Sequence, residues 1–581
     1  MTAQQGAGRC VLLALAVQTG CLAQSWTSQT TDEPAPSESE HRASEVPIIE
    51  GSVAPPVDSA ESMIEPCHLS FQVDEELTLE IPVLTLCEAE HARSFVGTLP
   101  PGAIWDAHEQ VIRFTPDAFQ GGGSHTVALE FRASDGGVVG QGEVQIQVRN
   151  TVTHPEWTLI STRERLNGRL HVFQQHVNEH LANPETDASE FTVEVGIPNG
   201  TIAAGSMPLR VYLHGFNGEA TVEPVAHEFR MAVADPHNTY WYGELGPDGR
   251  PQPYSERRVL HAIEQTLREY PGIDADRVYL VGPSMGGAGA ATIGLVHNRH
   301  FSWVYATIGQ AIPRNHRVVR LAQLAAIWGT PVPLVATQTL LEPWDTRDLT
   351  WVAEHVPGAV DQFLVLKHGK DDPIIHFGAM LEASPLTGRS FYGTMTTLHM
   401  AGLAAWDEGG HGTPDPLLED GWWMDGWDPA SGQPSLSRTT PTVALTANSC
   451  DEDPGSRVGD GSREWNSSAG FAGDVTRPAD SGWGGDPAGA RNRGVRWTNV
   501  ADTVERLHLQ VWTEHPACEM AHAAVTVHRA QWFRLAAGEQ VAWAMGEQRG
   551  MAMADGYGLV TIEGVTLTRT PTTLLLERVW R

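Results

Sequence analysis

A serine between glycines follows a short apolar run near the middle of the chain. The apolar run is 278–281, the pattern Gly-x-Ser-x-Gly is centred on Ser284, and small residues follow at 288–291. Where such a pattern joins a buried strand to a helix, the serine sits on a sharp turn with its hydroxyl exposed above a sheet. The spacing therefore predicts that Ser284 is a nucleophile.

The partners that a nucleophilic serine requires follow in the order acid, then histidine. Asp372 comes shortly after the apolar run 363–366, and His411 lies in a glycine-rich stretch at 409–412. A serine hydroxyl is a poor nucleophile until an imidazole takes its proton, and a carboxylate fixes the imidazole tautomer and stabilises its cation. An acid at the carboxyl end of a parallel strand lies at the sheet edge where ligands bind. We expect Ser284, His411 and Asp372 to act together.

Other residues compete for these roles. Asp345 follows a further strand-like run at 332–337, and Asp371 precedes Asp372, so both are fallback acids. An Asp-Asp-Pro sequence after a strand is also typical of a turn or a helix cap. Three other histidines compete with His411, namely His368, His376 and His399.

A second loop is predicted to complete the site. The run 209–213 reads as a strand that ends in His214-Gly215-Phe216. The backbone N–H groups of Phe216 and of Met285, the residue after the serine, can then form an oxyanion hole. Each preorganised donor of this kind contributes roughly 3–4 kcal/mol to stabilising a tetrahedral transition state.

These motifs together carry a family resemblance. They resemble the motifs of α/β-hydrolase esterases, in particular polyhydroxyalkanoate-depolymerase-like and feruloyl- or acetyl-xylan-esterase-like enzymes: His214-Gly215, the Ser284 turn, His368-Gly-x-x-Asp372 and Gly410-His411. The stretch 368–372 is also similar to prolyl-oligopeptidase-type serine peptidases. The resemblance spans 191–427, under half of the chain. It implies an eight-stranded, mostly parallel sheet with helices on both faces, and acyl transfer through an acyl-serine.

The function that these residues favour is the hydrolysis of carboxylic esters without a metal or an organic cofactor. Tryptophans are expected to form walls for an apolar, aromatic or sugar ester, polymeric or carbohydrate-linked substrates included, although tryptophan is also common in protein cores. These residues are Trp241, Trp344, Trp406, Trp422, Trp423 and Trp427. Two alternatives remain: a prolyl-oligopeptidase-like serine peptidase, and a non-catalytic surface adhesion protein built on a hydrolase fold.

Length and charge limit the other possibilities. The chain has 581 residues, with 71 acidic against 38 basic side chains and a net charge of −33. This length predicts about three or four domains. The acidic balance argues against a nucleic-acid partner, because no basic face is available to neutralise phosphates.

The N-terminus predicts export. Arg9 precedes a short apolar run at 10–17, and a Gly-Cys pair ends at Cys21. This pattern is typical of a signal peptide over 1–23, with Cys21 lipidated or with ordinary cleavage after Ala23. The protein is then an outer-membrane or cell-surface lipoprotein, anchored only through that lipid, or a secreted protein. Residues 24–60 are rich in Ser, Thr, Pro and Glu and predict a disordered tether.

The remaining cysteines agree with export. Cys67, Cys87, Cys450 and Cys518 form an even set, which in an exported chain suggests two disulfides. Pairing by domain gives Cys67–Cys87 and Cys450–Cys518, and four cysteines allow three connectivities. Their spacings do not suit a zinc site.

Two β-rich regions are expected to flank a catalytic domain at 155–430. Alternating apolar and polar residues at 61–150 predict a small β-sandwich, which resembles Ig-like or cadherin-like modules and which we interpret as a spacer. Similar runs predict a second β-rich domain at 436–581. The acidic residues at 451–453 lack the spacing of a calcium-binding EF-hand and read as a solvated loop.

Overall fold

The structure is a computed structural model that describes the chain from Ile64 to Val579 with gaps. The gaps are 75–78, 87–93, 97–102, 107–110, 115, 117–122, 133–137, 150–155, 187–189, 332–342, 357, 371, 373, 408–409, 412–435, 455–488 and 516–517. The predicted signal peptide, Cys21 and the tether therefore lie outside the described residues, as does the strand expected at 332–337. None of the described helices is long and apolar enough to cross a membrane.

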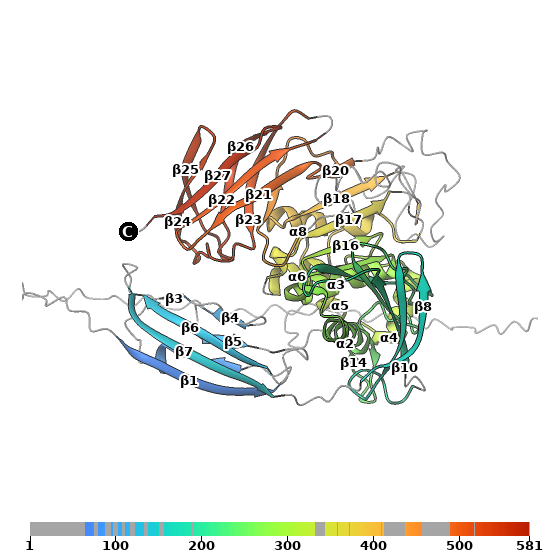
Figure 1. Cartoon of the computed structure of the whole chain (residues 1–581). Helices are drawn as coiled ribbons and strands as arrows, with labels where there is room; N and C mark the ends of the chain where they lie inside the picture. The colour runs from blue at the N-terminus through green and yellow to red at the C-terminus, as the bar shows by residue number, and fades with distance from the viewer. Residues whose placement is uncertain are drawn as a thin grey trace, which may run out of the picture. The chain divides into compact units, whose positions relative to one another are not determined.

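The N-terminal region is a sandwich of two sheets (Figure 1, blue to cyan). One sheet has the order β1 (Ile64–Asp74), β7 (Val138–Arg149), β6 (Ser124–Arg132) and β3 (Ser94–Val96). The other has the order β2 (Leu79–Ile81), β5 (Val111–Phe114) and β4 (Ala103–Asp106), and the short helix α1 (Val83–Leu86) follows β2. Alternate residues of both sheets, such as Ile112 and Val144, form one core. The alternation of apolar and polar residues in the sequence therefore corresponds to the expected β-sandwich.

A ten-stranded sheet forms the centre of the next region of the chain, with the order β20-β18-β17-β16-β15-β11-β12-β10-β9-β8. Its six central strands are mutually parallel: β12 (Phe229–Val233), β11 (Met207–Leu213), β15 (Ile273–Pro283), β16 (Trp303–Thr307), β17 (Leu364–Gly369) and β18 (Gly402–Asp407). The antiparallel edge strands are β8 (Thr158–Arg165), β9 (Gly168–His176), β10 (Glu190–Pro198) and β20 (Gly489–Arg491).

The strand order reverses between β12 and β15. After β11 the chain moves outward to β12 and then returns past β11 to form β15. In open sheets, ligands bind beyond the carboxyl ends of the strands at such a reversal. The sheet has ten strands where eight were expected; the β8–β9 hairpin forms one edge, and β20, from the C-terminal region, pairs with β18 at the other.

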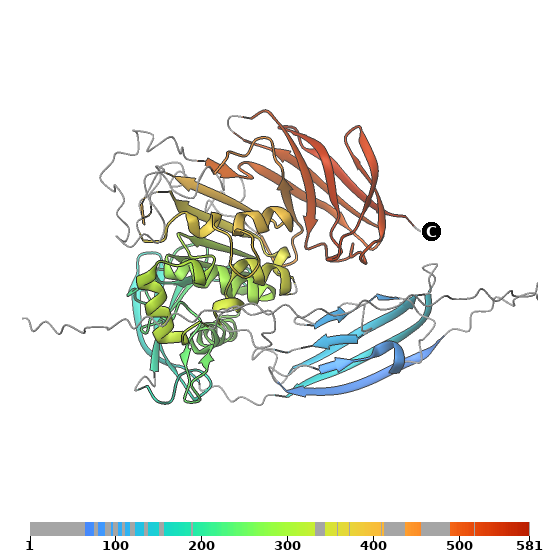
Figure 2. The same ribbon diagram turned by 180° about the vertical axis from the view of Figure 1, so that it is seen from behind.

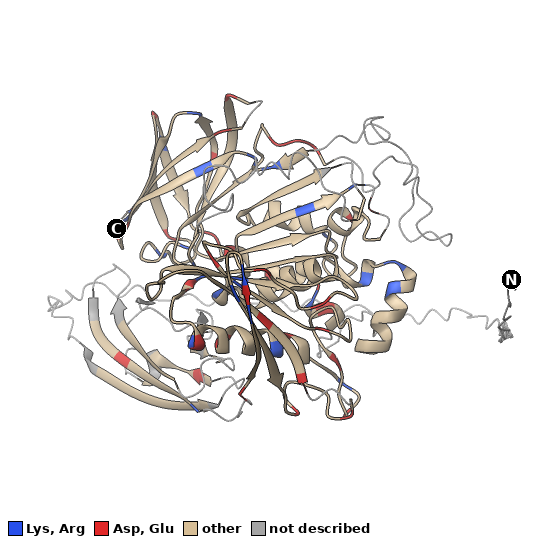
Figure 3. Cartoon of the chain, turned by 45° about the vertical axis from the view of Figure 1, so that its right-hand side comes forward, with Lys and Arg blue, Asp and Glu red and all other residues tan. Residues whose placement is uncertain are grey.

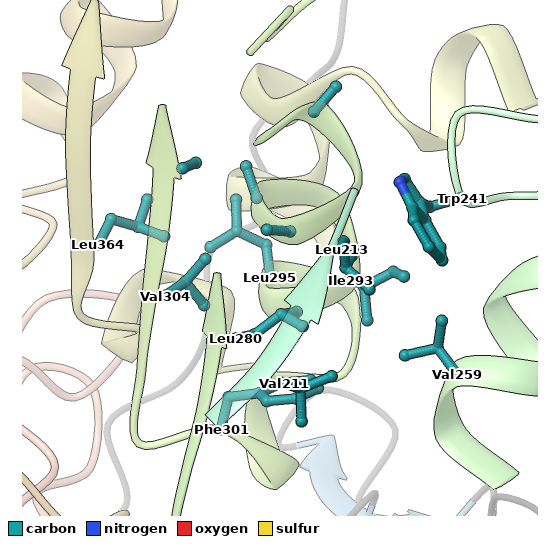
Figure 4. Close-up of a cluster of buried hydrophobic side chains, with 14 of the residues drawn as sticks. Val211, Leu213, Trp241, Val259, Leu280, Ile293, Leu295, Phe301, Val304 and Leu364 are labelled. Atoms are coloured by element: carbon teal, nitrogen blue, oxygen red, sulfur yellow. The ribbon is translucent and has the colours of Figure 1, made fainter. Parts of the chain in front are cut away.

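The helices of the described chain cover one face of this sheet (Figures 1 and 2). They are α2 (Tyr254–Glu269), α3 (Met285–Val296), α4 (Val318–Trp328), α5 (Pro343–Thr346), α6 (Leu349–His355), α7 (Gly378–Leu381) and α8 (Phe391–Thr397). Short 3₁₀ turns are η1 (Asn298–His300), η2 (Pro313–Asn315) and η3 (Ala359–Asp361), and β13 (Glu244–Leu245) pairs with β14 (Pro251–Gln252). Figure 4 shows the core between sheet and helices, where Val211, Leu280 and Val304 meet Ile293 and Leu295 of α3.

The second face of the sheet differs from the expectation of helices on both faces. Its core residues include Tyr279, Trp303 and Val365, and within the described chain no helix contributes to this cluster. Leu436 and Ala444 pack there instead. The C-terminal region thus supplies part of the layer for which the resemblance implied helices.

The C-terminal region is a second pair of sheets (Figure 2, orange to red). One has the order β19 (Thr442–Thr446), β23 (Met520–His528) and β26 (Thr561–Thr568). The other has the order β21 (Val495–Asp502), β22 (Arg506–Thr513), β27 (Thr572–Arg578), β24 (Gln540–Met545) and β25 (Gln548–Met553).

One of the two expected disulfides lies in this C-terminal region. Cys450 and Cys518 are bonded, with their Cα atoms 6.0 Å apart. Cys67 is also disulfide-bonded, and its predicted partner Cys87 lies outside the described residues.

Candidate active site

Ser284 occupies the turn between β15 and α3 in a conformation that few residues adopt. Its φ is 57° and its ψ −120°. A side chain on either neighbouring glycine would collide with backbone, because a Cβ at Gly282 would lie 2.3 Å from the Gly286 oxygen and a Cβ at Gly286 would lie 2.0 Å from the Leu213 oxygen. The glycines therefore allow the turn to pack against the end of β11 while it holds the serine in a strained geometry.

The structure brings the three residues predicted for catalysis into one hydrogen-bonded row. Ser284 Oγ lies 2.8 Å from His411 Nε2, and His411 Nδ1 lies 2.7 Å from Asp372 Oδ2. The Asp372 side chain is fully buried, whereas that of His411 is 21% exposed. Backbone contacts fix the serine, since Ser284 N–H donates to the Thr307 carbonyl at 2.9 Å.

The acid is held just beyond the end of β17 by its own backbone contacts. Asp372 Oδ1 accepts hydrogen bonds from the N–H groups of Ile374 at 2.7 Å and Ile375 at 2.9 Å. Oδ2 is thereby directed at His411. An orientation set by backbone donors is rigid, as a residue that fixes an imidazole tautomer must be.

The competing residues have other partners. Asp345 is buried in α5 and pairs with Arg314 at 2.8 Å, and Asp371 lies outside the described residues. Each competing histidine makes a different structural contact: His368 Nε2 with the Ile375 carbonyl, His376 Nδ1 with the Gly378 N–H, and His399 Nδ1 with Thr446 Oγ1. Burial lowers the pKa of His368, which favours its neutral form.

The loop after β11 lies against the serine, where an oxyanion hole is expected. A Cβ at Gly215 would be 3.6 Å from the Cβ of Ser284. Among the hydrogen bonds of the described residues, none uses the backbone N–H of Phe216 or of Met285. Met285 is the first residue of α3, where N–H groups lack partners within the helix and the helix dipole favours negative charge. Within the described ranges, both predicted donors are thus without an acceptor in the protein.

Supporting contacts that sequence reasoning missed hold this loop in place. His214 Nε2 accepts from the Asp235 N–H at 2.9 Å, so His214 Nδ1 carries the proton and donates to the Gly215 carbonyl at 2.8 Å. Trp241 Nε1 donates to the His214 carbonyl at 3.2 Å. The His-Gly pair marked the loop in the sequence, but nothing there indicated which distant residues would brace it.

A reciprocal amide pair adds a further brace. Asn217 N–H donates to Asn238 Oδ1 at 2.6 Å, and Asn238 Nδ2 donates to Asn217 Oδ1 at 2.9 Å. Both asparagines have positive φ, 57° and 54°, a conformation that asparagine tolerates better than most residues. The pair ties the loop 214–217, which follows β11, to the segment that carries Trp241.

The expectation that tryptophans wall the substrate pocket does not hold for three of them. Trp241 and Trp344 are 1% exposed and Trp406 is 2% exposed, all within the core beneath the helices (Figure 4 labels Trp241). Their burial follows from packing between strands and helices, which composition does not reveal. Trp422, Trp423 and Trp427 lie outside the described residues.

A cavity of about 580 Å³ lies on the other face of the sheet, behind the serine turn. Arg210, Tyr212, Arg230 and Tyr305 line it together with Pro283, and Ser284 is not among its lining residues. We therefore do not assign this cavity to the reacting substrate. Among the described residues, no group of three or more His, Cys, Asp and Glu side chains is placed to hold a metal ion.

The chain resembles several solved structures over less than half of its length. No family model and no curated protein sequence matches the chain. Among solved structures, S-formylglutathione hydrolase from Agrobacterium tumefaciens is 17% identical with a TM-score of 0.30, and covers 44% of this chain and 92% of its own. Acetyl xylan esterase from Paenibacillus sp. R4 is 13% identical with a TM-score of 0.31, over 47% of this chain and 87% of its own. Acylaminoacyl peptidase from Pyrococcus horikoshii is 12% identical with a TM-score of 0.28, over 49% of this chain and 50% of its own.

These scores are too low to assign a function, and the geometry of the chain itself identifies the fold. A mostly parallel sheet reverses its strand order between β11 and β15, and a strained serine turn joins β15 to α3. An acid follows β17 and a histidine follows β18. The region built on the ten-stranded sheet has the α/β-hydrolase fold.

Proposed function

We propose that this protein is a serine esterase that hydrolyses carboxylic esters through an acyl-serine intermediate. The observation that carries the proposal is the row of hydrogen bonds from Asp372 through His411 to Ser284, at 2.7 and 2.8 Å. A serine on a strained turn, a histidine that can take its proton and a buried carboxylate form the arrangement that activates a hydroxyl for acyl transfer.

In the acylation step, Ser284 Oγ attacks the ester carbonyl carbon while its proton passes to His411 Nε2. Asp372 Oδ2 accepts the hydrogen bond of His411 Nδ1 and stabilises the imidazolium. The carbonyl oxygen becomes an oxyanion, to which the N–H groups of Phe216 and Met285 donate. The carbon–oxygen bond to the alcohol then breaks, and His411 Nε2 returns its proton to the departing alkoxide.

Deacylation repeats the same sequence with water. His411 Nε2 takes a proton from a water molecule, the resulting hydroxide attacks the acyl carbon, and the second oxyanion forms in the same hole. Collapse of this intermediate releases the carboxylic acid and returns the proton to Ser284 Oγ. Neither step requires a metal ion or an organic cofactor.

A substrate panel tests the esterase assignment. We expect turnover of 4-nitrophenyl acetate and of at least one of an acetylated sugar, a feruloyl ester and a hydroxybutyrate ester, and loss of that turnover in Ser284→Ala. Cleavage of prolyl or acylated peptides without turnover of esters would support a peptidase instead. An unreactive wild-type protein that binds surfaces would favour the adhesion alternative.

We also propose that the protein is exported. Disulfides are typical of exported proteins, and the Cys450–Cys518 bond agrees with this location. If Cys21 is lipidated, Cys21→Ala should move the protein from the membrane fraction to the soluble fraction of the expressing cells. Unchanged fractionation would leave ordinary cleavage after Ala23 as the better account.

A further inference from the structure

Helix α4 begins beside the loop 214–217, which follows β11, in a stretch that is basic although the chain as a whole is strongly acidic. Arg314, Arg317 and Arg320 fall within seven residues of a protein whose net charge is −33 (Figure 3 colours the charged residues). Arg314 has an acidic partner, since it pairs with Asp345 at 2.8 Å. The local excess of positive charge is therefore concentrated further along, toward Arg320.

Within the described part of the chain, Arg320 is a buried cation without a carboxylate partner. The residue is 8% exposed, and its Nε and Nη1 atoms are buried with no hydrogen-bond partner among the described residues. The guanidinium carbon lies 4.1 Å from the centre of the Phe216 ring and 5.7 Å from that of Tyr240. Among the ion pairs of the described ranges, none includes Arg320.

Burial of the Arg320 guanidinium destabilises the folded protein, and the described contacts do not fully offset this cost. Burying a charge is unfavourable unless it is paired, and a cation–π contact offsets only part of the cost. Burial lowers the pKa of Arg320, which reflects the same desolvation. A guanidinium offers paired N–H donors that match a carboxylate, so a bound anion would restore the missing interaction.

Arg320 is also close to the reacting groups. It stacks on the ring of Phe216, whose backbone N–H belongs to the expected oxyanion hole, and the adjacent Gly215 lies against Ser284. Burial, followed by the charges of Arg320, Arg317 and His411, holds the pKa of His316 well below its ordinary value. His316 is thus within electrostatic reach of both Arg320 and His411.

We propose that Arg320 recognises an anionic group on the substrate, so that the preferred esters carry a carboxylate in addition to the ester that is cleaved. This inference rests on the proposed esterase function and names its substrate class. Phe216, Val318 and Val319 are exposed beside Arg320, so an apolar portion next to the carboxylate would also find contacts. The carboxylate is carried by the acyl group or by the alcohol.

Matched substrates separate charge from shape. Mono-4-nitrophenyl succinate has a carboxylate at the end of its acyl group, and 4-nitrophenyl succinamate has a neutral amide of the same size. Acetyl esters of 4-hydroxybenzoate and 4-hydroxybenzamide make the same comparison on the alcohol side. In one of the two pairs we expect kcat/KM of the wild type to be about 10- to 100-fold higher for the anionic member, the range for a charge-assisted hydrogen bond.

Two substitutions assign this preference to Arg320. Arg320→Met should reduce the anionic-to-neutral ratio of kcat/KM to about one, mainly by raising KM for the anionic ester, and Arg320→Lys should keep part of the preference. Arg506→Met is the matched control, since it removes one positive charge from an exposed position on β22 and should leave the ratio unchanged. Rates are expressed per serine that reacts with a neutral fluorophosphonate.

The opposite results are distinct. If the wild type has the same kcat/KM for each neutral ester as for its anionic partner, the inference is overturned but the esterase function stands. Equal losses of kcat on both members of a pair in Arg320→Met would mean that Arg320 only positions Phe216. An equal fall of the ratio in Arg506→Met would indicate a general field effect and also overturn the inference. A wild type that hydrolyses no ester contradicts the proposed function itself.

A measurement on the wild type alone covers the case in which Arg320 variants do not fold. Succinamate and succinamide have the same shape and differ by one charge. Both compounds are tested as competitive inhibitors of 4-nitrophenyl acetate hydrolysis. Succinamate should bind about tenfold more tightly than succinamide, or 4-hydroxybenzoate should bind about tenfold more tightly than 4-hydroxybenzamide. Equal inhibition within both pairs contradicts the inference.

Discussion

The Nε2 atom of His411 lies 2.8 Å from the Oγ atom of Ser284, although 127 residues separate the two in the chain. The contact arises because β15, β16, β17 and β18 are successive parallel neighbours, so the loops that follow them open at one edge of the sheet. The serine follows β15 and the histidine follows β18. The chemistry proposed here depends on this convergence.

Replacement of Asp372 by Asn should disable the site without removing its shape. Asp372 Oδ1 accepts two backbone N–H groups, so the amide oxygen of Asn would take that place and its NH₂ would face His411. His411 Nδ1 must then accept a hydrogen bond from that NH₂ group, so the imidazole proton moves to Nε2. A protonated Nε2 cannot take the proton of Ser284. We expect kcat for 4-nitrophenyl acetate to fall on the order of 10⁴-fold. A variant within tenfold of the wild type would mean that another acid orients His411.

The strain at Ser284 predicts a difference in stability between two inactive variants. Both Ser284→Ala and Ser284→Gly remove the nucleophile, but only glycine relieves the unfavourable backbone at φ 57° and ψ −120°. The glycine variant should have a free energy of unfolding about 1 kcal/mol higher than the alanine variant, measured by urea denaturation. An alanine variant that is the more stable of the two would argue against backbone strain at this turn.

Sequence reasoning could find Ser284, Asp372 and His411 because each follows a feature with a local signature. The serine lies between glycines after an apolar run, and the acid follows another such run. The glycines were also informative, since Gly286 has no room for a side chain. Each of these signals is local. The order of serine, acid and histidine along the chain indicated that they belong to one site.

The residues that sequence reasoning misjudged or missed depend on contacts between distant segments. Trp241 was expected at a pocket wall, but it is buried and supports the His214 carbonyl. Tertiary packing decides whether a tryptophan lies in the core or in a pocket. The neighbouring residues in the sequence do not indicate which of the two occurs. β20 likewise joins the central sheet by pairing with β18, a strand distant from it in sequence, so the edge of the sheet could not be predicted from either segment alone.

The close packing of the serine turn predicts a large effect from one added methyl group. In Gly286→Ala the new Cβ would lie 2.0 Å from the Leu213 oxygen, and the two backbones could not keep their positions. We expect a loss of at least about 3 kcal/mol in the free energy of unfolding, together with loss of activity. Gly556→Ala is the control, because nothing lies within 4 Å of its added Cβ. Similar urea midpoints for the two variants would contradict the packing described for the turn.

Asp451 should make stability depend on pH. It was expected in a solvated loop, but burial raises its pKa from an ordinary 3.8 to about 7, while its Oδ1 accepts from the Asn492 N–H and Asn448 Nδ2. Because the folded pKa lies above the unfolded one, the unfolded state ionises first as the pH rises. This group's contribution to the free energy of unfolding therefore declines from about pH 4 to about pH 7 and is constant above that.

Asp451→Asn isolates this effect, because the amide oxygen can keep both hydrogen bonds and the amide carries no charge at any pH. Thermal unfolding of the two proteins at pH 5 and pH 8 provides the comparison. The asparagine variant should gain stability relative to the wild type as the pH rises. Differences of the same size at both pH values would show that Asp451 does not titrate in this range.

The most direct test of the account is the mass of the protein after reaction with a fluorophosphonate, followed by peptide mapping. We expect one adduct per chain, on Ser284, in the wild type, and no adduct in Ser284→Ala or His411→Ala variants that remain folded. An adduct on another residue, or one that persists in Ser284→Ala, would contradict the assignment of the nucleophile.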